Sequence, residues 1–209
     1  MIFLNSGFTY LFFILLIFLL LIIIFLLFLP LYNYLFSKKN FKNKIYKIIY
    51  HYALINDFYL INNLELVKDE EVKAVIDHVL FSNKYIYVIK SKYYDDVIDG
   101  KKEDKIWISY DKKCRKEEIF NPLLLNKERC DRFSLYKHLD ITFFISIVVV
   151  NNNIKLKNLS ELNSFNSYIC KIKDLKKLIK SIEKRNVSKF NADSLDKEVK
   201  DIAKEIGRL

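Results

Sequence analysis

An uninterrupted apolar run near the N-terminus constrains this chain more than any other feature. Residues 1–37 contain no Asp, Glu, Lys or Arg, and Phe8–Leu29 consists largely of Leu, Ile and Phe. As a helix this run would extend about 33 Å, which matches the ~30 Å hydrocarbon core of a bilayer. It is apolar on all sides, whereas a helix lying on a membrane surface needs a polar face. The sequence therefore predicts a transmembrane helix over 8–29, with a break at Pro30.

The flanks of this run predict its orientation. The first seven residues carry no charged side chain, whereas the other flank carries Lys38, Lys39, Lys42 and Lys44. Because basic flanks stay in the cytoplasm, we expect a single-pass protein of the cell membrane with its N-terminus outside. These lysines are also candidates for contact with anionic lipid or nucleic acid. A cleaved signal peptide fits poorly, since no basic n-region or small-residue cleavage site is present. Interfacial aromatic belts would contain Tyr10, Tyr32 and Tyr34.

The remainder of the chain is strongly charged. All 35 Lys and Arg and all 25 Asp and Glu lie beyond residue 37, and so does the net charge of +10. Roughly 170 residues are enough for one domain with a real core. The odd number of cysteines, without paired spacing, predicts free thiols in a reducing compartment. The scattered histidines do not suggest a metal site, and three glycines cannot supply a phosphate-binding glycine loop.

Apolar spacing and turn signals predict an α/β domain, a mixed sheet flanked by helices. Residues 41–55 have helical spacing, and Asn121–Pro122 opens a helix to about Leu139. Strands are predicted over 58–63, 73–81, 85–92, 97–98, 105–110, 141–150 and 168–172, all in one sheet, with a charged loop at 64–71. Two amphipathic helices follow at 173–184 and 194–206, the second capped by Asp193 or Ser194. The predicted parts are a short extracytoplasmic N-terminus (1–7), the transmembrane helix (8–29), a basic juxtamembrane linker (30–40), the α/β domain (41–172) and the C-terminal helices (173–209).

One predicted hairpin brings together residues that could carry chemistry. Asp77 lies in its first strand, and Lys90 and Lys92 end its second strand. Because side chains alternate along a strand, Lys90 and Lys92 share a face. The tight turn at 82–84 places Asp77 opposite that end of the second strand.

The residues of this region resemble the nuclease-related domain (NERD) family, which is similar to the PD-(D/E)XK restriction-endonuclease-like fold. The family's pattern is an Asp in an I-D-H strand, E-x-K closing the next strand, a G…W segment, and N-P-x-x-Q-N opening a helix. The resemblance covers roughly residues 41–160. The matching positions are Ile76, Asp77, His78, Lys92, Gly100, Trp107, Asn121, Pro122 and Asn126.

The resemblance implies a Mg²⁺-dependent nuclease, in which an Asp and a Glu hold the metal and a lysine positions water. Asp77 and Lys92 are then the implied catalytic residues, with Asp77 as the metal ligand. The family's Glu position, however, is Lys90. Further departures are Val75, Tyr85, Leu125 and the absence of a glycine- and glutamate-rich start at 40–44.

Exchanging a carboxylate for an ammonium changes the local charge by two units, worth several kcal/mol at about 4 Å. We therefore expect Lys90 to pair with Asp77 and to take the metal's place. The expected protein has no cofactor, or binds Mg²⁺ if the site is active. Other carboxylates could restore a site, namely Glu65, Asp95 or Asp96. Trp107 is expected in the core and His78 in a structural role.

Two functions of different class are consistent with these features. The first is a membrane-anchored NERD-like domain that engages DNA or RNA on the cytoplasmic side with weak or lost nuclease activity. The alternative is a membrane-tethered, non-catalytic scaffold that binds a protein partner through its C-terminal helices. A Ser-His-Asp or Cys-His hydrolase has no sequence support, since a G-x-S-x-G elbow is absent.

Overall fold

The computed structural model describes residues 3–68, 71–157 and 159–205, and their side chains except those of 3–9, 30–37, 68, 71–73 and 159–160. The chain divides into two compact units, Met1–Asn40 and Phe41–Leu209.

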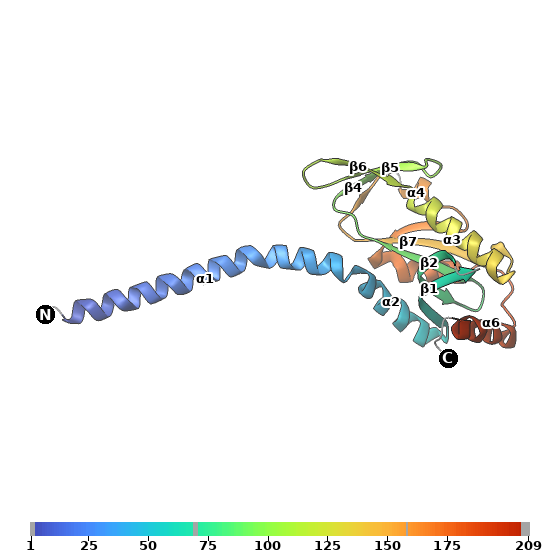
Figure 1. Ribbon diagram of the computed structural model, residues 1–209, viewed down its shortest axis with the longest axis horizontal. Helices are drawn as coiled ribbons and strands as arrows, with labels where there is room; N and C mark the ends of the chain where they lie inside the picture. Colours follow the sequence, from blue (N-terminus) through green and yellow to red (C-terminus); the bar gives the residue numbers. More distant parts are fainter. Residues whose placement is uncertain (1–2, 69–70, 158, 206–209) are drawn as a thin grey trace. The chain divides into compact units, whose positions relative to one another are not determined.

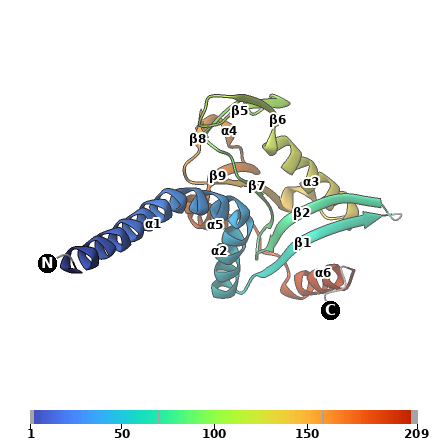
Figure 2. The same ribbon diagram turned by 60° about the vertical axis from the view of Figure 1, so that its left-hand side comes forward.

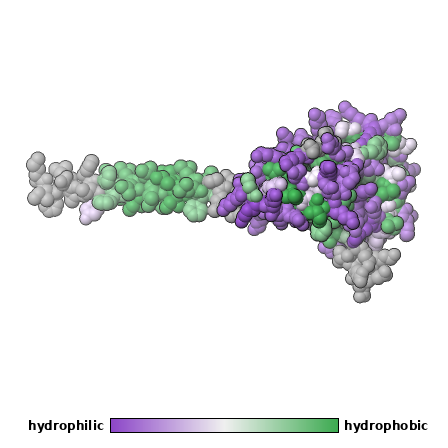
Figure 3. Space-filling model, turned by 90° about the horizontal axis from the view of Figure 1, so that it is seen from above, coloured by the Kyte–Doolittle hydropathy of each residue, from purple (hydrophilic) through white to green (hydrophobic). Residues whose placement is uncertain are grey.

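The first unit is one helix, α1 (Phe3–Lys39) (Figure 1). Within it, Tyr10–Leu29 is long and apolar enough to cross a membrane, with a mean hydropathy of 3.7 over 20 residues. Its side chains from residue 10 to 29 are exposed, and Figure 3 shows them as a continuous apolar surface. The predicted break at Pro30 is wrong, because α1 continues to Lys39. A proline removes one backbone hydrogen bond, and a long helix can absorb that loss without ending. The side chains of Tyr32 and Tyr34 lie outside the described part.

The second unit is built on a mixed sheet with the strand order β1-β2-β3-β7-β9. Its strands are β1 (Tyr59–Lys68), β2 (Glu71–Phe81), β3 (Ile86–Lys92), β7 (Phe144–Val150) and β9 (Ser167–Lys171). The first three pair antiparallel, whereas β3, β7 and β9 run parallel. Every residue of β7 is buried, as its continuous apolar run predicts. The predicted strand start at 141 is wrong, because residues 141–143 form an exposed 3-10 turn.

Strand β1 is longer than its sequence suggests. The predicted loop at 64–71 is wrong, because 64–68 belong to β1 and Glu71 begins β2. The charged residues there alternate with apolar ones: Leu64 and Leu66 are buried and Glu65 is exposed. This alternation is the mark of a half-buried strand.

A smaller mixed sheet has the order β6-β5-β4-β8. It consists of β4 (Val97–Asp99), β5 (Ile106–Tyr110), β6 (Lys116–Phe120) and β8 (Lys155–Leu156). The expectation that 97–98 and 105–110 extend the main sheet is wrong. Ile98 and Trp107 instead pack in one cluster with Val148 and Val150 of β7, so these strands cover the main sheet rather than lengthen it.

Helices cover both faces of the main sheet (Figures 1 and 2). On one face lie α2 (Phe41–Asn56) and α5 (Leu175–Glu183), which share a core with β2, β3, β7 and β9. On the other lie α3 (Pro122–Lys137) and α6 (Ala192–Glu205), which share a core with β1, β2 and β3. A short helix, α4 (Leu159–Leu162), and two 3-10 turns (Ile141–Phe143 and Ile172–Asp174) complete the unit. The predicted mixed α/β class is confirmed.

The C-terminal helices pack on their own domain. Val199 and Ile202 of α6 are buried in one cluster with residues of β1, β2 and α3. Tyr59 of β1 donates a hydrogen bond to Asp196 of α6 at 2.9 Å. The predicted cap of α6 is wrong. Asn191 accepts hydrogen bonds from the backbone N–H groups of residues 193 and 194 instead.

Candidate functional site

Asp77 lies at the point where two strands of the main sheet separate. The β2–β3 ladder pairs 78–81 with 86–89 and stops there, whereas β2 continues along β1 alone. Asp77 is thus the first residue of β2 beyond the β2–β3 ladder. The predicted hairpin and its turn at 82–84 are confirmed. Strands that diverge leave space between them, and Asp77 is 5% exposed within that space.

Two ammonium groups and one backbone amide surround the Asp77 carboxylate. Lys90 Nζ donates to Asp77 Oδ1 at 2.9 Å, and Lys42 Nζ lies 2.9 Å from the same oxygen. The backbone N–H of Ser91 donates to Oδ2 at 3.0 Å. The expected Lys90–Asp77 pair is therefore present, with a second cation that the sequence did not predict.

These contacts determine the ionisation of Asp77. Burial by itself raises the pKa of a carboxyl group, because it penalises the charged form. The Ser91 amide and the Lys90 and Lys42 ammoniums outweigh that effect, so the pKa of Asp77 is held below its ordinary value. Asp77 is a carboxylate whose charge is more than neutralised.

Lys92 ends β3 on the same face as Lys90. Burial lowers the pKa of Lys92, and the neighbouring Lys90 and Arg129 lower it further. Arg129 of α3 donates to the carbonyl oxygen of Val75 on β2 at 3.1 Å. A pocket of about 290 Å³ lies beside Lys90 and is lined by Ala74, Val75, Lys90, Leu125, Glu128, Arg129 and Arg132. The site is thus a concave, positively charged surface between β2, β3 and α3.

His78 holds the backbone next to the site. It is buried, its Nδ1 lies 2.6 Å from Asn62 Oδ1, and its Nε2 lies 3.5 Å from Ser91 Oγ. Its ring stacks on Tyr46 of α2. Burial lowers the pKa of His78 to about 4, so the imidazole is neutral at pH 7. Its contacts fix Ser91, whose amide donates to Asp77, which agrees with the expected structural role.

The donor set around Asp77 does not fit a divalent metal. Mg²⁺ requires several hard oxygen donors in near-octahedral geometry. Both Asp77 oxygens already accept hydrogen bonds, and the described residues contain no group of three His, Cys, Asp or Glu that could hold a metal. Glu65 is exposed on β1, Asp96 pairs with Lys155 at 3.4 Å, and Asp95 lines a separate pocket with Arg115.

The four flanking lysines differ in their surroundings. Lys38 and Lys39 are exposed in the last turn of α1, and Lys44 is exposed on α2. Lys42, with a side chain 42% exposed, is turned to Asp77. The helical spacing of 41–55 could have suggested this, because Phe41 and Ile45 face the sheet and place Lys42 at the edge of the buried face.

The other matched residues support the scaffold. Asn121 caps α3, and its Nδ2 donates to the carbonyl oxygens of Lys102 and Asp104 at 2.9 and 2.8 Å. Asn126 is fully buried and donates to the Val88 carbonyl and to Ser146 Oγ, each at 2.9 Å. These bonds join α3 to the connection between β4 and β5 on one side and to β3 and β7 on the other.

Gly100 and Trp107 form the remaining matched pair. A Cβ on Gly100 would lie 2.2 Å from the Trp107 ring, so the indole occupies the space of a side chain. Trp107 is fully buried and donates to the Lys101 carbonyl at 2.7 Å. The expected core position of Trp107 is confirmed.

Comparison with known proteins agrees with this geometry. The family model for the nuclease-related domain matches residues 37–151, which is more than half of the chain. No curated protein and no solved structure matches. The matched segment contains Asp77, Lys90, Lys92, the Gly100–Trp107 pair and the cap of α3. The chain therefore belongs to the NERD family of nuclease-related domains.

Proposed function

We propose that this protein is a single-pass, membrane-anchored NERD protein. Its cytoplasmic domain, which we take to have the PD-(D/E)XK-like fold, binds the phosphate backbone of nucleic acid without a metal and with weak or lost nuclease activity. The observation that carries the proposal is the 2.9 Å contact between Lys90 Nζ and Asp77. In this proposal an ammonium occupies the place of Mg²⁺.

The charge around Asp77 supports binding of an anion. Lys42, Lys90, Lys92 and Arg129 bring four positive charges, and Asp77 brings one negative charge. Positive side chains that outnumber the nearby carboxylates attract phosphate. The pKa of Lys92 is lowered first by burial and then by repulsion from Lys90 and Arg129. A nucleic-acid phosphate would relieve that repulsion and release counter-ions from the polymer.

The binding test uses the full chain in detergent micelles with a fluorescent DNA duplex and its RNA counterpart. We expect binding at low salt that weakens steeply as salt rises. Lys92→Gln should weaken binding and reduce the slope of log K against log salt by about one. Lys176→Gln on α5, which removes one exposed lysine from the other face of the sheet, is the matched control and should bind normally. Absence of binding at low salt would refute nucleic-acid engagement.

The catalytic test measures Mg²⁺-dependent cleavage by the same protein. We expect little or none from the natural chain and a gain from Lys90→Glu, which restores a second carboxylate beside Asp77. Strong cleavage by the natural chain that is lost in Asp77→Ala would refute the loss of activity.

Membrane orientation is testable through one cysteine. Among the described residues, Cys114 is an exposed free thiol, whereas Cys130 and Cys170 are buried. With the N-terminus outside, a membrane-impermeant maleimide should label Cys114 only after the membrane is opened. Labelling in intact cells would reverse the proposed orientation.

The protein partner expected for the C-terminal helices remains a prediction. The apolar residues Ile179 and Ile182 of α5 and Val199 and Ile202 of α6 are buried in the domain's own core. A partner would therefore have to bind their polar faces, and co-purification of a defined protein from membranes without nucleic-acid binding would favour the scaffold function.

A further inference from the structure

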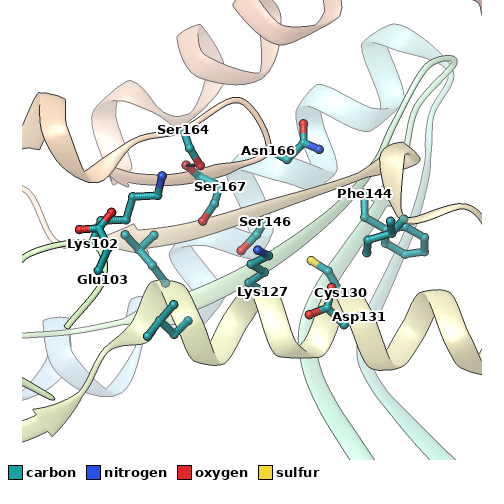
Figure 4. Close-up of a pocket in the computed structure, with 13 residues that line it drawn as sticks. Lys102, Glu103, Lys127, Cys130, Asp131, Phe144, Ser146, Ser164, Asn166 and Ser167 are labelled. Carbon is teal, nitrogen blue, oxygen red and sulfur yellow. Dashed lines mark hydrogen bonds between the residues drawn. The ribbon is translucent and has the colours of Figure 1, made fainter. Parts of the chain in front are cut away.

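A second pocket lies on the side of α3 where β7 and β9 begin (Figure 4). Its volume is about 270 Å³, and its walls come from α3, the 102–103 segment, the start of β7 and the 164–167 segment. The lining residues are Lys102, Glu103, Leu123, Leu124, Lys127, Cys130, Asp131, Ile141, Phe144, Ser146, Ser164, Asn166 and Ser167.

This pocket is separate from the Asp77 site. Strands β3 and β7 run parallel, with Ile86 opposite Phe144 and Lys92 opposite Val150. The Asp77 site is at the carboxyl end of β3, on the side of α3 that faces β2 and β3. The second pocket lies on the side of α3 that faces β7 and β9, and it shares no lining residue with the pocket beside Lys90.

The pocket has a buried apolar floor and an exposed apolar mouth. The apolar Leu123 and Phe144 are each 2% exposed, whereas Leu124 and Ile141 at the mouth are 38% and 41% exposed. Covering exposed apolar side chains with another apolar group is favourable, because it removes apolar surface from water. The mouth therefore favours a ligand with an apolar part.

Charged groups of both signs line the same pocket. Lys102 and Lys127 contribute ammoniums, and Glu103 and Asp131 contribute carboxylates (Figure 4). Within the part of the chain that the structure describes, none of these four side chains forms an ion pair or a side-chain hydrogen bond. The pocket is electrically balanced, yet each of its charges is available to a ligand.

Serine and asparagine side chains add polar contacts. Ser146 is hydrogen-bonded to Asn126, and the hydroxyls of Ser164 and Ser167 line the opposite wall. Asn166 belongs to the same wall.

From this combination we infer that the pocket binds a small amphipathic zwitterion, of the class of a free α-amino acid with an apolar side chain. The apolar group packs on Phe144, Leu123 and Leu124, the carboxylate faces the lysines, and the ammonium faces Asp131 and Glu103. A volume of about 270 Å³ is near the lower end of the roughly 300–1,000 Å³ range of small-molecule pockets. It therefore suits a small ligand, of the size of leucine or phenylalanine.

The experiment measures binding to the full chain in detergent micelles by isothermal titration calorimetry. The probes are L-leucine and L-phenylalanine, together with 3-phenylpropanoate, which lacks the ammonium, and phenethylamine, which lacks the carboxylate. We expect saturable binding of at least one amino acid, and binding of each singly charged analogue about tenfold weaker or more. Absence of amino-acid binding up to millimolar concentration, or equal binding of the analogues, would overturn the inference.

Two conservative surface variants locate the binding to this pocket. Lys127→Gln and Asp131→Asn each remove one charge at partly or fully exposed positions on α3 and should weaken amino-acid binding about tenfold. Lys176→Gln on α5 is the matched control and should bind as the natural chain does. If Lys127→Gln and Asp131→Asn both bind normally, the ligand is elsewhere and the assignment of this pocket is wrong.

Discussion

Replacing Asp77 by Asn should destabilise the domain substantially. The change removes one negative charge while keeping the size of the side chain and one oxygen acceptor. It leaves the Lys90 ammonium, whose side chain is 18% exposed, without its counter-ion. Lys42 can instead turn into water, because its side chain is 42% exposed. The loss is therefore dominated by the Lys90 charge.

The magnitude follows from the contact itself. At 2.9 Å an ion pair is worth about 6 kcal/mol at an effective dielectric constant of about 20. Desolvation offsets much of this, and removing one partner of a buried pair typically costs about 3–5 kcal/mol. Lys42 adds less than about 1 kcal/mol because of its exposure. We expect a loss of about 3 kcal/mol in the free energy of unfolding.

The assay is thermal unfolding of the full chain in detergent, followed by the fluorescence of Trp107, which is the single tryptophan and is fully buried. A loss of about 3 kcal/mol corresponds to a decrease of about 6–12 °C in Tm for a chain of this size. The double variant Asp77→Asn, Lys90→Met should recover most of that loss, because the unpaired charge is gone. A Tm unchanged in Asp77→Asn, or lower still in the double variant, would refute the reasoning.

Acid should reduce the stability difference between the natural chain and the Asp77→Asn variant. The pKa of Asp77 in the folded protein is below its ordinary value. Ionised Asp77 therefore contributes its full stabilisation above about pH 3.9, the pKa of an Asp in the unfolded chain. This stabilisation is lost as the pH falls through the lower pKa of Asp77 in the folded protein. The two unfolding free energies should therefore converge in that acidic range, and a difference that grows on acidification would contradict the sign of the shift.

Three further predictions concern the scaffold. Gly100→Ala should destabilise the domain by about 2 kcal/mol or more, measured as a lower Tm, because the new Cβ meets the Trp107 ring at 2.2 Å; an unchanged Tm would contradict it. The pKa of His78 is about 4 in the folded protein and about 6.5 in the unfolded chain, so unfolding takes up a proton between these pH values. The free energy of unfolding should therefore fall by about 3 kcal/mol from pH 7 to pH 4, and His78→Gln should flatten this decline. Ile202→Ala should cost about 3 kcal/mol in urea unfolding through the cavity it leaves, and a loss below 1 kcal/mol would show that α6 is dispensable.

Local sequence signals predicted most helices and strands, because a capping residue, a turn or an apolar run indicated each of them. The cap at Asn121, the turn at 82–84 and the uniformly apolar β7 all lie where the sequence places them. The Asp77–Lys90 contact was also predictable, since strand alternation and a short turn determine which side chains meet across a hairpin.

The missed features depend on contacts distant in sequence. Helical spacing places Lys42 at the edge of the buried face of α2. Its contact with Asp77 also requires α2 to pack on this part of the sheet, which no local pattern specifies. The separation of β4 and β5 into a second sheet follows from the packing of Trp107 against Val148 and Val150. The pocket at the start of β7 and β9 joins residues from 102 to 167, which the sequence could not bring together without the topology.

The most direct test of the account is a titration of the full chain with Mn²⁺, a divalent ion suited to oxygen ligands and visible by electron paramagnetic resonance. The natural chain should bind no ion at the Asp77 site at millimolar concentration, because Lys90 and Lys42 already neutralise that carboxylate. Lys90→Glu should create a site that Asp77→Asn then abolishes. Binding of Mn²⁺ by the natural chain that disappears in Asp77→Asn would contradict the claim that Lys90 takes the metal's place.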